Sequence, residues 1–232
     1  MKTPLPSFRT LFTNAWHELV EHWKLLMTVS LGIALIQLLV SYVLPSSWTN
    51  FNQLFVSGAK PGLDLTPTIV IIVVLAFVVN VILQSVLYYS VVNRTKEGLT
   101  LAHAFNGGLS VSLKILAVVI LKTILTLIGF VLFIIPGILA WVWLSFAEFA
   151  SIKENLGVIE SLKRSKELTR GFFAAILGRL LLMALVVAVP TMILSLIPAG
   201  ALIVTVIATP LSILYFVNLY EARLSATSNL SS

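Results

Sequence analysis

The sequence predicts an all-α integral membrane protein with six transmembrane helices. Of its 232 residues, 59% are hydrophobic and 10% are charged, whereas an average soluble domain is roughly a quarter charged. Apolar segments recur along the whole chain, and at about 1.5 Å per residue most are long enough to cross roughly 30 Å of hydrocarbon. Basic residues fall on alternate loops between them. The predicted spans are 25–44, 67–92, 112–135, 137–152, 172–195 and 200–220.

The basic residues predict the orientation of these spans. Most of the fifteen Lys and Arg lie in the N-terminal segment, the second and fourth loops and the C-terminal tail, namely Lys2, Arg9, Lys24, Arg94, Lys96, Lys114, Lys153, Lys163, Arg164, Lys166, Arg170 and Arg223. The opposite side holds only Lys60. The positive-inside rule therefore predicts cytoplasmic N and C termini. The net charge of +6 is explained by topology, with attraction to anionic lipid head groups as a second effect, and it gives no reason to expect nucleic-acid binding.

The first span follows a predicted amphipathic helix. Seven apolar residues share one helical face, namely Phe8, Leu11, Phe12, Ala15, Trp16, Leu19 and Trp23. Such a helix is expected to lie in the membrane interface with Trp16 and Trp23 at head-group depth. The only sizeable loop on the far side is predicted at Ser46 to Thr66, and Pro67 then opens the second span, as proline does well in a first helical turn.

The middle of the chain predicts a second helical hairpin. Thr100 to Phe105 reads as a short helix that ends at Gly107-Gly108, before the third span begins. Pro136-Gly137 separates the third and fourth spans without any charge. An uncharged turn between two apolar segments indicates a transmembrane hairpin, because a turn in water is normally polar.

A second amphipathic helix, Val158 to Arg170, precedes the last hairpin. Its basic residues are expected to contact lipid head groups, and they are Lys163, Arg164, Lys166 and Arg170. The order of interfacial helix, span and returning span thus occurs three times, at about 8–92, 99–152 and 156–220. We interpret the chain as one polytopic membrane domain, 1–232, built from three parallel units.

One stretch resembles a known family. It comprises Ile134-Ile135-Pro136-Gly137-Ile138, Leu144-Ser145-Phe146-Ala147 and Glu154-Asn155-Leu156-Gly157, followed by the segment from Glu160 to Gly171. These residues resemble the YciC-type inner-membrane proteins and the related membrane domain found beside glycerophosphoryl diester phosphodiesterases. The resemblance implies a multi-pass protein of the bacterial cytoplasmic (inner) membrane, in a family without an established activity, so it assigns no catalytic residues.

Three charged residues fall inside predicted spans, and they are the candidate site. Lys122, Glu148 and Arg179 lie where an unpaired charge costs about 2.5 to 3.5 kcal/mol on insertion scales. We expect Glu148 to pair with Lys122 or Arg179 beside a polar cleft that opens to the cytoplasm. The alternative is that both cations snorkel to head groups and Glu148 lies at the interface.

The polar wall of this cleft is expected on the second span. Asn80, Gln84 and Tyr88 recur every four residues, so they share a helical face that should point into the bundle. The sequence His17-Glu18-Leu19-Val20-Glu21-His22 is better explained as a solvated polar face than as a zinc site, because a zincin helix needs histidines four apart. No catalytic residue, metal site or cofactor is predicted.

The sequence is compatible with three classes of function. A non-enzymatic membrane protein that supports envelope or lipid homeostasis, through lipids, a membrane-protein partner or a homo-oligomer, fits the amphipathic helices best. The alternative is a small transporter or channel for an anionic solute or lipid, which would pass Lys122 and Arg179. A membrane-embedded enzyme would need two titratable groups that converge on one pocket.

Overall fold

The protein is all-α throughout the part that the computed structural model describes, which is residues 5–43, 67–96, 99–194, 196–197 and 200–228. The predicted loop Ser46 to Thr66, with Lys60, and Lys2 near the N-terminus lie outside these residues. The described helices are α1 (Phe8–Glu21), α2 (Trp23–Val43), α5 (Pro67–Val92), α6 (Leu101–Leu132), α7 (Ile134–Trp143), α8 (Ala147–Lys153), α9 (Val158–Thr169), α10 (Phe173–Leu194) and α11 (Gly200–Ser228).

Six helical segments are long and apolar enough to cross a membrane. They are Trp23–Val43, Pro67–Val92, Leu101–Leu132, Ile134–Lys153, Phe173–Leu194 and Leu202–Thr227. The prediction of a multi-pass, all-α membrane protein is therefore confirmed, and each segment overlaps one predicted span. The orientation with both termini in the cytoplasm stays a prediction.

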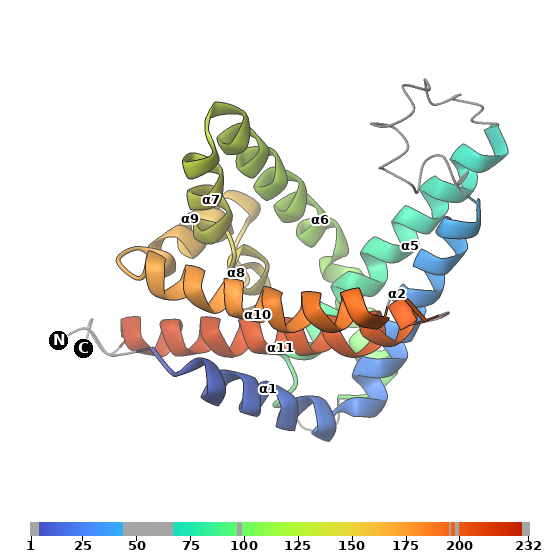
Figure 1. The fold of residues 1–232 in the computed structure, drawn as a ribbon, viewed down its shortest axis with the longest axis horizontal. Coiled ribbons are helices and arrows are strands. Elements are labelled where there is room, and N and C mark those ends of the chain that lie inside the picture. Colours follow the sequence, from blue (N-terminus) through green and yellow to red (C-terminus); the bar gives the residue numbers. More distant parts are fainter. Residues whose placement is uncertain (1–4, 44–66, 97–98, 195, 198–199, 229–232) are drawn as a thin grey trace.

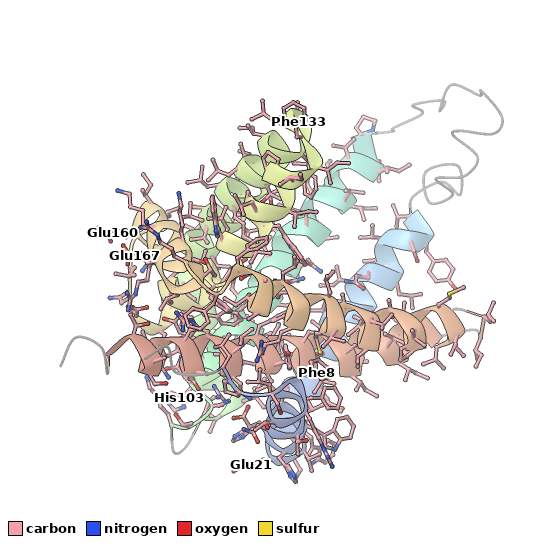
Figure 2. All side chains as sticks on the ribbon, turned by 60° about the vertical axis from the view of Figure 1, so that its left-hand side comes forward. Phe8, Glu21, His103, Phe133, Glu160 and Glu167 are labelled. Atoms are coloured by element: carbon pink, nitrogen blue, oxygen red, sulfur yellow. The ribbon has the colours of Figure 1, made fainter. Side chains whose placement is uncertain are left out.

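The spans form three hairpins (Figure 1), and α11 of the last one packs against α2 and α5 of the first. The closed ends of α2–α5, α6–α7 and α10–α11 point away from one another, while α1 lies along α11. The hairpin ends carry exposed apolar side chains, such as Phe133 at the tip of α6–α7 (Figure 2), which is 75% exposed. The largest buried side chains include Tyr215 and Tyr220 of α11 and Phe146 and Phe149 of the α8 region, so the packed core lies where the hairpins meet.

The α6 helix is longer than predicted. A separate short helix ending at Gly107-Gly108 was expected, but α6 runs unbroken from Leu101 to Leu132. Gly108 instead allows α6 to approach α5 closely, since an added Cβ would lie 2.4 Å from the Cα of Val86. The hairpin turn also lies earlier than Pro136, because the extended residue is Phe133 and Pro136 belongs to the first turn of α7.

The fourth span is broken between α7 and α8. Ser165 of α9 fills the break: its hydroxyl donates to the Trp143 carbonyl at 2.7 Å and accepts from the Phe146 N–H at 3.0 Å. Irregular backbone at membrane depth is stable only when protein groups satisfy it in this way. A new helix, α8, begins after the break, and Glu148 lies in its first turn.

The apolar face of α1 divides into two stripes. Leu11, Ala15 and Leu19 are buried in the protein core, where α1 packs beside α11. Trp16 and the neighbouring Trp23 of α2 remain exposed, at 46% and 52%. The prediction that the whole face lies in the membrane interface was therefore wrong for the buried stripe, because the sequence does not show which helix covers it.

Candidate functional site

An ion pair inside the helical bundle anchors the candidate site. The Lys122 ammonium of α6 lies 2.7 Å from the Glu148 carboxylate of α8. The Glu148 side chain is only 4% exposed, and that of Lys122 is 22% exposed. One of the two pairings expected from the sequence is thus present. A buried carboxylate at this depth needs such a partner, because an unpaired charge there is strongly unfavourable.

A groove of about 480 Å³ lies beside this pair, between α5 and α6. Its α6 wall is almost entirely aliphatic and runs from Ile115 to Ile124. Its α5 wall carries Asn80, Gln84 and Tyr88, and Glu148 reaches the groove from α8. The structure therefore brings together four of the six residues expected to form the cleft. Lys122 does not line the groove and contacts it only through Glu148.

The polar groups of the α5 wall are without a hydrogen-bond partner in the part of the chain that the structure describes. Within the described residues, the side-chain polar atoms of Asn80, Gln84 and Tyr88 make no hydrogen bond, and only the Tyr88 ring is held, by packing on Phe149 with 5.6 Å between centroids. An amide in hydrocarbon without a hydrogen bond costs on the order of 1–3 kcal/mol. These groups can therefore form hydrogen bonds with polar atoms of a ligand in the groove.

Arg179 is held away from the groove. Its guanidinium donates to the carbonyl oxygens of Leu5 and Pro6, at 3.2 and 2.6 Å, and to that of Ala175 at 2.8 Å. These hydrogen bonds of Arg179 therefore hold Leu5 and Pro6 against α10. Of the two cations expected at the cleft, Arg179 is thus engaged elsewhere, by backbone carbonyls that the sequence pattern gives no means of identifying.

The predicted head-group residues of α9 occupy a second concave region. Lys163, Lys166 and Arg170 line a pocket of about 510 Å³ together with Trp143 and Glu167. The Lys166 ammonium lies 4.7 Å from the Trp143 ring centroid.

Arg164 differs from these neighbours. Its Nε donates to both carboxylate oxygens of Glu154, at 3.2 and 2.9 Å, so its charge is neutralised within the protein.

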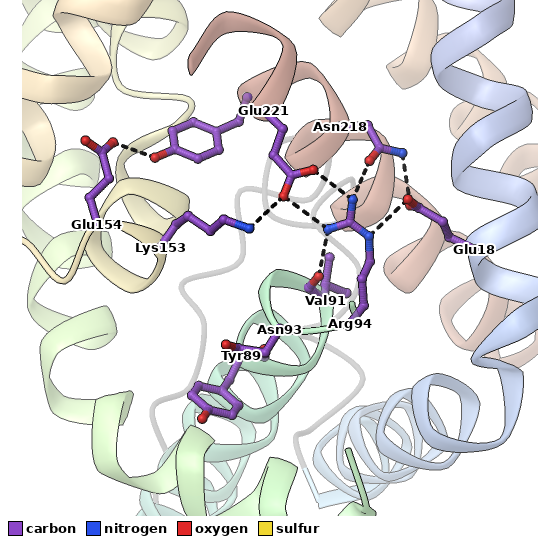
Figure 3. A network of polar contacts seen from close by, with 10 residues as sticks. Glu18, Tyr89, Val91, Asn93, Arg94, Lys153, Glu154, Asn218 and Glu221 are labelled. Atoms are coloured by element: carbon purple, nitrogen blue, oxygen red, sulfur yellow. Dashed lines mark hydrogen bonds and ion pairs between the residues drawn. The ribbon is translucent and has the colours of Figure 1, made fainter. Parts of the chain in front are cut away.

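The sequence gives no sign of a polar network that joins α1, α8 and α11 to the end of α5 (Figure 3). Arg94, just beyond α5, lies 3.0 Å from a carboxylate oxygen of Glu18 and 3.0 Å from one of Glu221, and donates to Asn218 at 2.7 Å. Lys153 adds a 3.0 Å contact to Glu221. Glu18 had been assigned to a solvated face, which was wrong, because its carboxylate instead joins α1 to α5 and α11.

The remaining chemistry of the described residues adds no metal centre. No group of three or more His, Asp or Glu among them is arranged to hold a metal ion. Comparisons with protein-family models, with curated proteins and with solved structures give no match for this chain. The resemblance to YciC-type proteins accordingly stays a prediction.

Proposed function

We propose that this protein is a non-enzymatic membrane protein that binds a lipid in the groove between α5 and α6. The observation that carries the proposal is the row of Asn80, Gln84 and Tyr88, whose polar atoms make no hydrogen bond to a described residue and face an aliphatic wall across about 480 Å³. Small-ligand sites typically measure about 300–1,000 Å³ and combine apolar walls with a few polar groups. An amphiphile matches both walls, because its acyl chain packs on α6 while its head group hydrogen-bonds to α5.

The hydrogen-bond acceptors of the groove favour a head group that bears an ammonium. Glu148 is the charged residue of the lining. One of its oxygens accepts from Lys122, and its other oxygen makes no hydrogen bond to a described residue. An ammonium group donates to carboxylate and amide oxygens, which are what this lining offers. We therefore propose that the ligand of the groove is an amine-bearing phospholipid such as phosphatidylethanolamine.

This lining argues against the transport of an anionic solute past Lys122 and Arg179. Lys122 is engaged by Glu148 at 2.7 Å, and Arg179 binds the backbone of Leu5 and Pro6. A role in envelope or lipid homeostasis at the bacterial inner membrane, with both termini cytoplasmic, agrees with lipid binding and with the family resemblance. Glu148 is held in an ion pair, which leaves it poorly suited to act as a general base.

The experiment is native mass spectrometry of the purified protein in mixed micelles of phosphatidylethanolamine and phosphatidylglycerol. Ile120→Trp fills the groove from α6 and is expected to abolish the retained ethanolamine lipid. Leu125→Trp is the matched control, because it lies on another face of the same helix with similar exposure, 40% against 49% for Ile120. Equal lipid retention by these two variants, or a preference for phosphatidylglycerol in the unmodified protein, would overturn the proposal.

A further inference from the structure

A second groove continues the lipid-binding groove toward the closed end of the α2–α5 hairpin. It measures about 460 Å³, lies between α2 and α5, and shares Phe77 and Asn80 with the first groove. Its α2 wall contributes the polar residues Gln37 and Ser41. The two grooves therefore meet at Asn80, close to the middle of α5.

Both grooves use a single face of α5. The α5 residues that line them are Val73, Ala76, Phe77, Asn80, Val81, Gln84 and Tyr88. Successive members are one, three or four residues apart, and such positions lie on one side of a helix. From Val73 to Tyr88 this face extends roughly 22 Å at about 1.5 Å per residue. It thus covers most of the roughly 30 Å thickness of a hydrocarbon core.

Polar side chains from α2 and α5 occur along the joined grooves. Ser41 and Gln37 stand on α2, Asn80 at the junction, and Gln84 and Tyr88 farther along. Within each helix, polar positions four apart are separated by about 6 Å along the axis, and the second groove brings Gln37 and Ser41 of α2 into one lining with Asn80 of α5. Gln37, like the amides of α5, makes no hydrogen bond to any residue that the structure describes.

We infer that the joined grooves form a path along which phospholipid head groups pass between the two leaflets. A head group in bare hydrocarbon loses its hydrogen bonds, whereas the amides of Gln37, Asn80 and Gln84 lie along the path, and Ser41, which donates to the Leu38 carbonyl, can still accept. The acyl chains remain in the surrounding bilayer and lie along the aliphatic side chains of α6. The passage is passive and equilibrates lipids between leaflets. It rests on the proposed function, since the α5–α6 groove is the head-group site at one end of the path.

The test uses the full chain reconstituted in liposomes. The probe is phosphatidylethanolamine with a nitrobenzoxadiazole fluorophore on its acyl chain, and external dithionite bleaches only the probe in the outer leaflet. With the unmodified protein, the inner-leaflet probe is expected to be bleached as well, because it reaches the outer leaflet. Val73→Trp fills the second groove without entering the first, and it should slow the loss of the inner-leaflet signal by about tenfold or more. Val74→Trp, whose side chain lines neither groove, is the matched control and should behave as the unmodified protein.

The outcomes separate this inference from lipid binding itself. Val73→Trp should still retain phosphatidylethanolamine in native mass spectrometry, because the α5–α6 groove is unchanged. If the unmodified protein leaves the inner leaflet protected while it retains the lipid, passage is refuted and binding survives. If Val73→Trp and Val74→Trp bleach at the same rate as the unmodified protein, the proposed path is wrong.

Discussion

Removal of Lys122 is the most informative perturbation of this protein. At the observed 2.7 Å, two unit charges attract by about 6 kcal/mol with an effective dielectric constant of about 20, before desolvation is subtracted. Lys122→Met leaves the carboxylate of Glu148, 4% exposed, without its partner. Breaking a buried pair from one side costs about 3–5 kcal/mol, whereas replacing both members by neutral residues is often nearly neutral.

The two single variants are expected to differ. Glu148→Gln leaves Lys122 unpaired, but its side chain is 22% exposed and long enough to reach water or head groups. This variant should therefore lose less stability than Lys122→Met. The double variant Lys122→Met/Glu148→Gln should recover most of the loss, within about 1 kcal/mol of the unmodified protein.

The assay is equilibrium unfolding of the purified protein in detergent micelles, followed by tryptophan fluorescence. Lys163→Met serves as the control, because Lys163 is exposed and has no ion-pair partner among the described residues, so that its loss should be within about 0.5 kcal/mol. A coupling energy below about 0.5 kcal/mol in the double-mutant cycle would refute the reasoning. The reasoning would also be refuted if Lys122→Met had the same free energy of unfolding as Lys163→Met.

Three further predictions concern the packing around the site, and the same unfolding assay measures each of them. Ser165→Ala removes the hydroxyl that bridges the break in the fourth span. It should lower the free energy of unfolding by about 2–4 kcal/mol, because two backbone groups lose their partner. The control is Ser110→Ala, whose hydroxyl bonds only within its own helix, and it should cost under about 0.5 kcal/mol. Gly108→Ala should cost about 1–3 kcal/mol by overpacking α6 on α5, while Gly178→Ala, where an added Cβ meets nothing within 4 Å, should be neutral or stabilising. Arg94→Gln should cost about 2–3 kcal/mol, since Glu18 and Glu221 lose their shared charged partner but keep Asn218 and Lys153, and a loss below about 1 kcal/mol would contradict the importance of the network.

The spans were predictable because the membrane imposes a length and a composition on them. Each must present a long apolar surface to lipid whatever its neighbours are, and segments such as Pro67–Val92 show this directly. The row of Asn80, Gln84 and Tyr88 was predictable for a similar reason, because one helical face is fixed by spacing alone. Their shared groove with Glu148 follows from that face.

Features that depend on distant partners could not be predicted. Glu18 looks like a surface residue until Asn218, 200 positions away, donates to it. The break before Ala147 contains neither proline nor glycine, and it depends on a serine of a later helix. Gly107-Gly108 suggested a helix end because glycine is a poor helix former, but close approach to α5 outweighed that preference.

The pairing of α1 with α11 bears on how the protein is made. The ribosome releases α1 long before α11, yet these two helices pack together, and Arg94 joins Glu18 to Glu221. During synthesis α1 therefore stays undocked until the α10–α11 hairpin has entered the bilayer. The contact can therefore close only after α11 has been made, and a nascent chain that stalls before α11 would leave α1 available to chaperones and proteases.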